Sequence, residues 1–223
     1  MSFLGMPFRE VEDSIPDLFD LLDRTTSQFG AFHPQTLDVA NRLAIAFWKI
    51  GDTPQAIGLL EQAIEAIACS GPDHPGRSDL LCTLAEIMVE QARWERAAML
   101  YREVLEASVR RFGSNHASSL TAKGDLALVL FELGEANEAC DFEKEAWESA
   151  SKHLGKTHPV TCVLAWNRAL RLENNGDGNA ARTILVDDLA WLLTEEDANL
   201  EADHHAVKAM LAQRWGWQSA AVC

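Results

Sequence analysis

The residues best suited to chemistry are four histidines that recur along the chain at almost constant intervals. They are His33, His74, His116 and His158, and the intervals between them are 41, 42 and 42 residues. Imidazole is a common ligand of zinc. Side chains that repeat once per helical unit, however, lie on the order of 10 Å apart, whereas ligands lie about 2.1 Å from a shared zinc ion. We therefore predict no metal site and expect these histidines to cap helices.

Four carboxylates offer a second kind of chemistry. Like charges gathered in a cleft raise each other's proton affinity, so such a cluster could act as a general acid or base on a bound small molecule. The sequence has no Gly-rich phosphate loop, no G-x-S-x-G and no H-E-x-x-H. We therefore predict no catalytic residues and no cofactor, and keep an enzyme only as an alternative. The four carboxylates are Glu86, Glu90, Asp125 and Glu132.

The cysteines suggest neither a disulfide framework nor a zinc site. Their number is odd and no C-x-x-C spacing occurs, so we expect reduced thiols packed as small apolar residues. The adjacent His204 and His205 lack a third ligand and are expected on the surface. The five cysteines are Cys69, Cys82, Cys140, Cys162 and Cys223.

The charge balance narrows the class of partner. The 223 residues include 19 basic and 34 acidic side chains, which gives a net charge of −15. Nucleic-acid binding and adhesion to anionic membranes both need basic surfaces, so we predict neither. Acidity instead favours basic or cationic partners. The sequence shows no secretory signal and no apolar run near the roughly 18 residues of a membrane span, and we expect a soluble, cytoplasmic protein.

A repeat of about 42 residues organises the whole chain. The same spacing occurs in three registers: one of the G-x-x-H motif from Gly30, which holds these histidines, one of turn residues from Gly51, and one of alanines from Ala56. All of them share the same 41-residue first step, which makes coincidence very improbable. Within a unit, apolar residues recur at three- and four-residue steps before and after the turn at Gly51 to Pro54, which is typical of two amphipathic helices. Strand signals are absent.

The flanks of the repeats read as half units. A helix from residue 14 to about 28 has the pattern of a second helix alone, with Ser14 and Pro16 as start signals, and a last helix matches a fifth first helix. Such terminal helices cover the apolar ends of a repeat array. We expect an N-terminal arm (1–13) followed by one domain (14–215) with a half repeat (14–29), four repeats (30–70, 71–112, 113–154, 155–198), a cap helix (203–215) and a tail (216–223).

The repeated unit follows a consensus of G-x-x-H-P-x-T-L, N-x-L-A, glycine and E/Q-A. It resembles the 42-residue tetratricopeptide repeat of kinesin light chains, which also occurs in bacterial and fungal regulatory proteins. The Leu-Ala, Gly and Ala spacing favours this class over HEAT or armadillo repeats. The resemblance spans about residues 14 to 215 and implies an all-α solenoid, a right-handed superhelix of about four helix pairs. The first unit carries it in Gly30, His33, Pro34, Thr36, Leu37, Asn41, Leu43, Ala44, Gly51 and Ala56.

Two charged residues depart from the consensus at apolar positions. Arg168 stands where the other units have leucine, and Glu143 stands where they have leucine or tyrosine. The second helix of one unit packs on the first helix of the next in this class of repeat, so the two positions should face each other. We predict a semi-buried Glu143–Arg168 ion pair, which is costly to break on one side.

The resemblance also implies a binding groove on the concave face, lined by the first helices. Its basic residues occur only in the first unit, and carboxylates interleaved with Trp48, Phe131 and Trp166 dominate elsewhere. Such a lining suits cations or basic peptides. The predicted groove comprises Asn41, Arg42, Ile45, Trp48, Lys49, Glu86, Glu90, Asp125, Leu128, Phe131, Glu132, Trp166, Asn167 and Glu173.

Three functions fit these features. The first is a non-catalytic adaptor that binds a protein or peptide in an open groove. The second is a small-molecule binder or enzyme that uses an acidic and aromatic closed pocket. The third is a homodimeric scaffold, for which exposed aromatics at Trp215 and Trp217 would be the contact.

Overall fold

The structure is a computed structural model that describes residues 8–68, 71 and 74–215. Every regular element in these ranges is a helix, and no strand occurs among them, which confirms the all-α fold class of paired helices with a helix at either end. The chain forms two compact units, residues 1–111 and 112–223, and each is described by itself. No helix in the described part of the chain is both long and apolar enough to cross a membrane.

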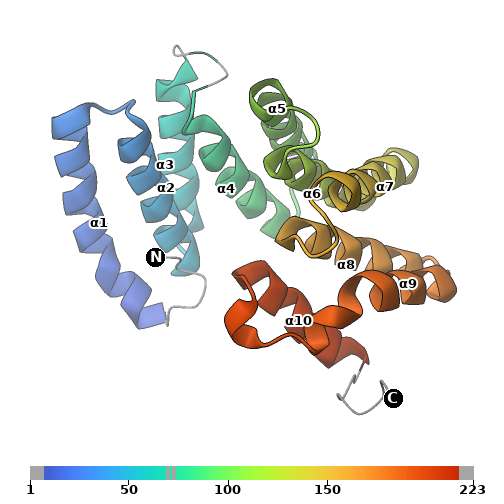
Figure 1. Ribbon diagram of the computed structural model, residues 1–223. Coiled ribbons are helices and arrows are strands. Elements are labelled where there is room, and N and C mark those ends of the chain that lie inside the picture. The colour runs from blue at the N-terminus through green and yellow to red at the C-terminus, as the bar shows by residue number, and fades with distance from the viewer. Residues whose placement is uncertain (1–7, 69–70, 72–73, 216–223) are drawn as a thin grey trace. The chain divides into compact units, whose positions relative to one another are not determined.

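The described residues of the first unit form five helices. Helices α1, α2 and α3 lie side by side (Figure 1), and α4 packs against both α2 and α3. Its core is aliphatic, with Leu43, Leu60 and Leu84 almost without solvent exposure. The helices are α1 (Phe8–Phe29), α2 (Pro34–Lys49), α3 (Thr53–Ala66), α4 (Arg77–Glu90) and α5 (Trp94–Phe112).

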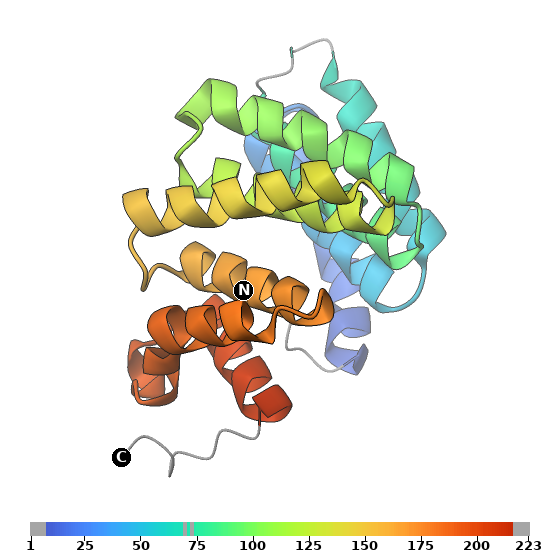
Figure 2. The same cartoon turned by 90° about the vertical axis from the view of Figure 1, so that its right-hand side faces the viewer.

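The second unit continues the pairing of first and second helices, and short helical segments precede its last helix. Figure 2 shows α8 in light orange between α7 in yellow and α9 in darker orange, and α8 also packs against α10. The α-helices are α6 (Ala117–Glu132), α7 (Ala136–His153), α8 (Pro159–Asn174), α9 (Gly178–Ile184) and α10 (Ala202–Trp215). Between α9 and α10 lie the π-helical η3 (Leu185–Leu189) and the 3-10 turns η4 (Ala190–Leu193) and η5 (Asp197–Asn199).

Three of the four repeated histidines begin first helices as their N-caps, whereas His74 precedes α4, whose N-cap is Gly76. His33, His116 and His158 are N-caps whose Nδ1 atoms accept backbone N–H bonds of 3.2 Å from the residue two positions later. His74 accepts a similar bond of 3.3 Å from the N–H of Gly76. An N-cap acceptor satisfies one of the otherwise unpaired N–H groups of the first turn. The histidines therefore position helices, and this role explains their period.

Helix α1 begins earlier than its start signals predicted. It begins at Phe8 and runs through Pro16, whereas Ser14 and Pro16 predicted a start near residue 14 after a separate arm. A proline inside a helix removes one hydrogen bond. The segment before the predicted start contains Arg9, Glu10 and Glu12, all strong helix formers, and they favour helix there despite this loss.

The second helix of the fourth repeat is irregular. After α9 the chain adopts one π-helical turn and then 3-10 geometry, so the repeat does not continue as a single straight helix. His204, expected on the surface, is buried: its Nε2 lies 2.9 Å from the carbonyl oxygen of Thr157, and its ring packs edge-on against Trp191. The irregular segment places Trp191 over α10, and this packing covers the histidine.

Candidate functional site

In the first unit, the predicted groove residues gather on the first helices α2 and α4. The indole N–H of Trp48, near the end of α2, donates a hydrogen bond to the carboxylate of Glu90 at the end of α4. This bond fixes the indole ring in a half-buried orientation. Asn41 lies on the same helix as Trp48, and its carboxamide oxygen is buried with no hydrogen-bond partner in the described residues.

Two carboxylates on α4 have perturbed acidity. Burial raises the pKa of Asp79, the nearby charge of Asp38 on α2 raises it further, and Arg111 partly lowers it. Desolvation by the surrounding protein also raises the pKa of Glu86, although water reaches its side chain. Both groups would therefore gain from an external cation, which stabilises the ionised form. We call Asp38, Asp79, Glu86 and Glu90 the acidic face of α2 and α4.

In the second unit, arginines already cover the rings of Phe131 and Trp147. The guanidinium carbon of Arg171 lies 3.1 Å from the ring centroid of Phe131, and that of Arg168 lies 5.3 Å from the ring centroid of Trp147. Arg168 and Arg171 both belong to α8. A cation–π contact with an external ligand at Phe131 would have to compete with the chain's own guanidinium.

These arginines meet one buried carboxylate. Arg168 Nη1 lies 3.7 Å from Glu143 Oε2, and Arg171 Nε lies 3.5 Å from Glu143 Oε1. The Glu143 side chain is 5% exposed and each arginine side chain 18%. Burial raises the pKa of Glu143, and the two arginines offset only part of that rise. The structure thus brings Glu143 and Arg168 together as α7 meets α8, and adds Arg171.

Trp166 does not lie on a groove surface. It is 4% exposed and belongs to the core formed with α9, η3 and α10. The position is equivalent to Asn41 and Gly124, and in the last repeat Val207 and Leu211 of α10 complete the core that encloses it. Its prediction as a groove residue is corrected here: the terminal helix that caps the array buries it.

Two predicted groove residues of the second unit, Asp125 and Asn167, line only a small space. This cavity of about 50 Å³ lies between α6 and α8, and Asp203 from the start of α10 also lines it. Such a volume holds little more than a water molecule. The remaining predicted residues of both units are partly or fully accessible on their helices: Arg42, Ile45, Lys49, Leu128, Glu132 and Glu173.

Three functional candidates were missed from the sequence. Arg171 occupies a position that is apolar in the other units, as Ala46, Ile87 and Val129 show, so a fuller alignment of the repeats would have found it. Lys156 and Asp188 form an ion pair of 2.6 Å, which no periodic signal marks because Asp188 lies in the irregular η3.

The cysteines and candidate metal ligands add no site. Cys82, Cys140 and Cys162 are free thiols, and burial followed by the charge of Asp188 raises the pKa of Cys162 to about 12. Cys69, Cys223 and Trp217 lie outside the described residues, as does the side chain of Trp215. Within the described ranges, no three side chains of His, Cys, Asp or Glu are grouped to hold a metal ion.

Comparisons with known proteins agree with this architecture. A tetratricopeptide repeat family model matches residues 78–152. A Podosopora anserina structure described as a putative kinesin light chain with nearly identical TPR-like repeats is similar at 22% identity, with a TM-score of 0.66, over 92% of this chain and 89% of that one. A variant of that protein with one residue replaced has 21% identity, a TM-score of 0.67 and the same coverage.

A third similar structure comes from P. vanneervenii. It is BtubC (BKLC), with 16% identity and a TM-score of 0.68, over 97% of this chain and 85% of that one. No curated protein matches the chain by sequence. At these identities the structural likeness establishes the fold.

Proposed function

Because the chain is a tetratricopeptide-repeat protein with the kinesin light chain-like fold, we propose that it is a non-catalytic adaptor that binds a basic segment of a partner protein on the acidic face of α2 and α4. The observation that carries this proposal is the gathering of four exposed carboxylates, Asp38, Asp79, Glu86 and Glu90, on the neighbouring helices α2 and α4. The raised pKa values of Asp79 and Glu86 agree with it.

The electrostatics of this face favour a cationic ligand. Desolvation makes the ionised forms of Asp79 and Glu86 less stable than they are in water, and a lysine or arginine side chain placed nearby would offset that penalty. Trp48 lies at the Glu90 end of this face, held by its bond to Glu90, and presents an aromatic surface to the apolar part of a long basic side chain. An acidic peptide would meet like charge here.

The second unit supports a peptide less well, and its groove supports a small molecule poorly. Arg171 covers Phe131, Trp166 is buried, and the enclosed space beside Asp125 and Asn167 measures only about 50 Å³. Drug-sized ligands occupy pockets of about 300 Å³ or more. We therefore place the partner site on the first unit.

The test is a binding titration with two short fluorescent peptides that differ only in charge, one with arginines and one with glutamates at the same positions. We expect the wild-type protein to bind the arginine peptide, with affinity falling as salt rises. Asp79→Asn combined with Glu86→Gln should weaken binding about tenfold or more, which corresponds to about 1.4 kcal/mol.

The matched control is Glu61→Gln combined with Glu65→Gln. Both residues are exposed on α3, a second helix, so this variant loses the same charge from another face. Equal weakening by the two double variants would show general charge attraction instead of a site. Preference for the glutamate peptide would overturn the proposal.

A further inference from the structure

One buried histidine joins helix α10 to the loop between α7 and α8. His204 lies in the first turn of α10 and is 5% exposed. The Nε2 atom of its ring lies 2.9 Å from the carbonyl oxygen of Thr157 in that loop, and its Nδ1 atom accepts the backbone N–H of Glu201 at 3.2 Å. These residues all belong to the second unit, so they are independent of the acidic face of α2 and α4.

The two bonds determine which ring nitrogen of His204 carries a proton. A backbone N–H only donates, so Nδ1 must present its lone pair to Glu201. A carbonyl oxygen only accepts, so Nε2 must carry the hydrogen that faces Thr157. The geometry therefore requires the neutral ring. A second proton, on Nδ1, would set one N–H group against another and remove the acceptor.

The bond from Glu201 also caps the helix. Glu201 directly precedes α10, its carbonyl oxygen accepts the N–H of His205 at 3.1 Å, and His204 is the third residue of the helix. A side chain at this position that accepts the N–H of the residue before the helix satisfies a donor that the helix itself leaves unpaired. The first turn is also the positive end of the helix dipole. Protonation of His204 would therefore cost α10 a capping bond and add an unfavourable charge.

The loop that faces the ring offers no negative charge to compensate for this cost. Thr157 lies between Lys156 and His158, both of which are bases. The ammonium of Lys156 is paired at 2.6 Å with Asp188 of η3, and the Nδ1 atom of His158 caps α8. Helix η4, which packs on the other side of the ring, contains no titratable residue. A charged His204 would therefore meet no carboxylate of the loop or of η4.

The carboxylates near the start of α10 are on the surface. Glu201 and Asp203 are exposed to water, which weakens their attraction for a charged ring. Lys208, one turn along the helix, adds a positive charge that already pairs with Asp197 at 2.8 Å. These neighbours leave the cost of a second proton on His204 largely uncompensated.

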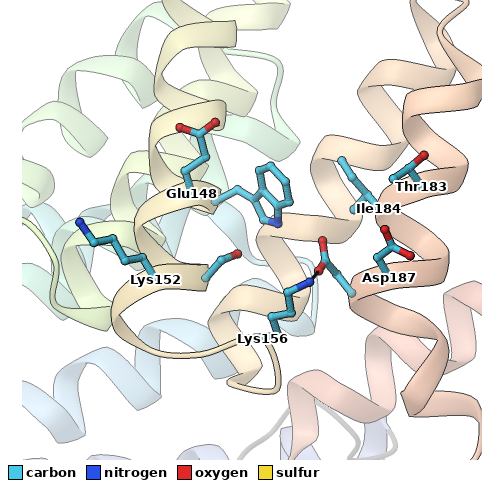
Figure 3. A pocket seen from close by; sticks show the side chains of 9 residues that line it. Glu148, Lys152, Lys156, Thr183, Ile184 and Asp187 are labelled. Atoms are coloured by element: carbon cyan, nitrogen blue, oxygen red, sulfur yellow. Dashed lines mark ion pairs between the residues drawn. The ribbon is translucent and has the colours of Figure 1, made fainter.

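The same histidine supports the irregular segment before α10. Its ring packs edge-on against Trp191 of η4, with 5.5 Å between ring centroids, and the indole of Trp191 donates to the carbonyl oxygen of Asp188 at 3.0 Å. Figure 3 shows Lys156 reaching from the α7–α8 loop toward the segment that contains α9 and η3, with its ion pair drawn as a dashed line. Lys156 and Thr157 thus hold η3 and α10 from one loop, and His204 is the member of this network whose type changes charge near neutral pH.

We propose that His204 is a pH sensor that keeps α10 docked while its ring is neutral and releases the helix when the ring takes up a second proton. An unperturbed histidine takes up this proton at about pH 6.5. The docked state needs the neutral ring, whereas the released ring is free to bind the proton, so docking weakens as pH falls. Release uncovers Trp166, which packs in one core with Val207 and Leu211 of α10.

The test is amide hydrogen exchange of the full chain, followed by NMR, with each rate divided by the intrinsic rate at the same pH. Between about pH 7.5 and about pH 5.5, we expect protection of the Val207 and Leu211 amides to fall about tenfold, since the lower value lies about one unit below the histidine reference. The indole N–H of Trp166 should lose protection in parallel. Helix α7, which begins without a histidine cap, should keep its protection.

The matched variants are His204→Gln and His205→Gln, both on α10, of which only the first changes the buried ring. Glutamine keeps one donor group and one acceptor group but does not titrate. We expect His204→Gln to remove the pH dependence of protection in α10, and His205→Gln to leave the roughly tenfold fall unchanged.

The ring nitrogen resonances of His204 in the wild-type protein give a second measurement, which does not depend on how the variants fold. The ring should take up its second proton over the same pH range in which α10 loses protection. Protection of α10 that does not change with pH would overturn the proposal, and so would a fall that persists in His204→Gln. A ring that takes up the proton while α10 stays protected would overturn it as well.

Discussion

The two units share one repeat and place their charges differently. In the first unit the helix–helix core is mainly apolar, the Arg77–Glu103 ion pair lies between α4 and α5, and four carboxylates lie on the accessible face of α2 and α4. In the second unit Glu143, Arg168 and Asp188 lie inside, and Arg171 covers the Phe131 ring. The same scaffold can therefore direct charge outward to a partner or inward to its own packing.

An acidic and aromatic composition can therefore serve either ligand binding or internal packing. Where the acids are on the surface and partly desolvated, they remain available to an external cation. Where guanidinium groups of the same chain already pair with the acid and stack on the rings, the composition serves the fold. Counting charges along the first helices cannot distinguish the two cases.

The largest expected effect tests the buried cluster of Glu143, Arg168 and Arg171. Glu143→Leu leaves two guanidinium groups, each 18% exposed, without their shared carboxylate, and should lower the free energy of unfolding by about 3–5 kcal/mol. Urea denaturation measures the loss. Adding Arg168→Leu should recover part of it, and adding Arg171→Val, the residue of the equivalent position in α6, should recover most.

The order of recovery is the informative result. If the double variant with Arg168→Leu were as stable as the triple variant, Arg171 would not belong to the cluster. If the double and triple variants both melted as low as Glu143→Leu alone, the charged groups would not act as a unit, and the loss would reflect a packing fault at residue 143.

A smaller effect, on the pH dependence of the free energy of unfolding, tests the surface carboxylates Asp79 and Glu86. Asp79 and Glu86 have raised pKa values in the folded protein, so between their ordinary and raised values the folded state binds more protons than the unfolded chain. Their contribution to the free energy of unfolding therefore falls as pH rises through that window. Asp79→Asn combined with Glu86→Gln should gain stability relative to wild type as pH rises from about 4 to neutrality.

Urea titrations at several pH values measure this difference, and the Glu61→Gln and Glu65→Gln variant corrects for loss of charge in general. A difference from wild type that does not change with pH would mean that the two carboxylates are as well solvated in the folded state as in the unfolded chain.

The smallest effect concerns one turn. Ala92 adopts a φ of 55°, in the region that glycine occupies at the equivalent Gly51, Gly134 and Gly176. Left-handed backbone is strained for a residue with a Cβ, so Ala92→Gly should raise the free energy of unfolding by about 1 kcal/mol. The reverse change, Gly134→Ala, should lower it in the second unit. A loss of stability in Ala92→Gly would show that chain entropy outweighs the strain at this turn.

The repeat alone predicted much of the fold. A period shared by three registers marks equivalent positions, and the three- and four-residue steps mark which face of each helix is apolar. From these two facts followed the helix pairs, the end helices and the juxtaposition of Glu143 with Arg168. Each of these features depends on the spacing of residues along the sequence.

What covers each position was decided only by the tertiary structure. Trp166 has the repeat position of Asn41, yet α10 buries it, because the last repeat packs against a cap instead of another full unit. Arg171 reaches Glu143 only because the packing of α7 on α8 brings the two side chains together. Asp188 faces Lys156 only because η3 departs from α-helical geometry. Periodicity defines equivalent positions along the chain, whereas burial and pairing depend on neighbours that differ from one repeat to the next.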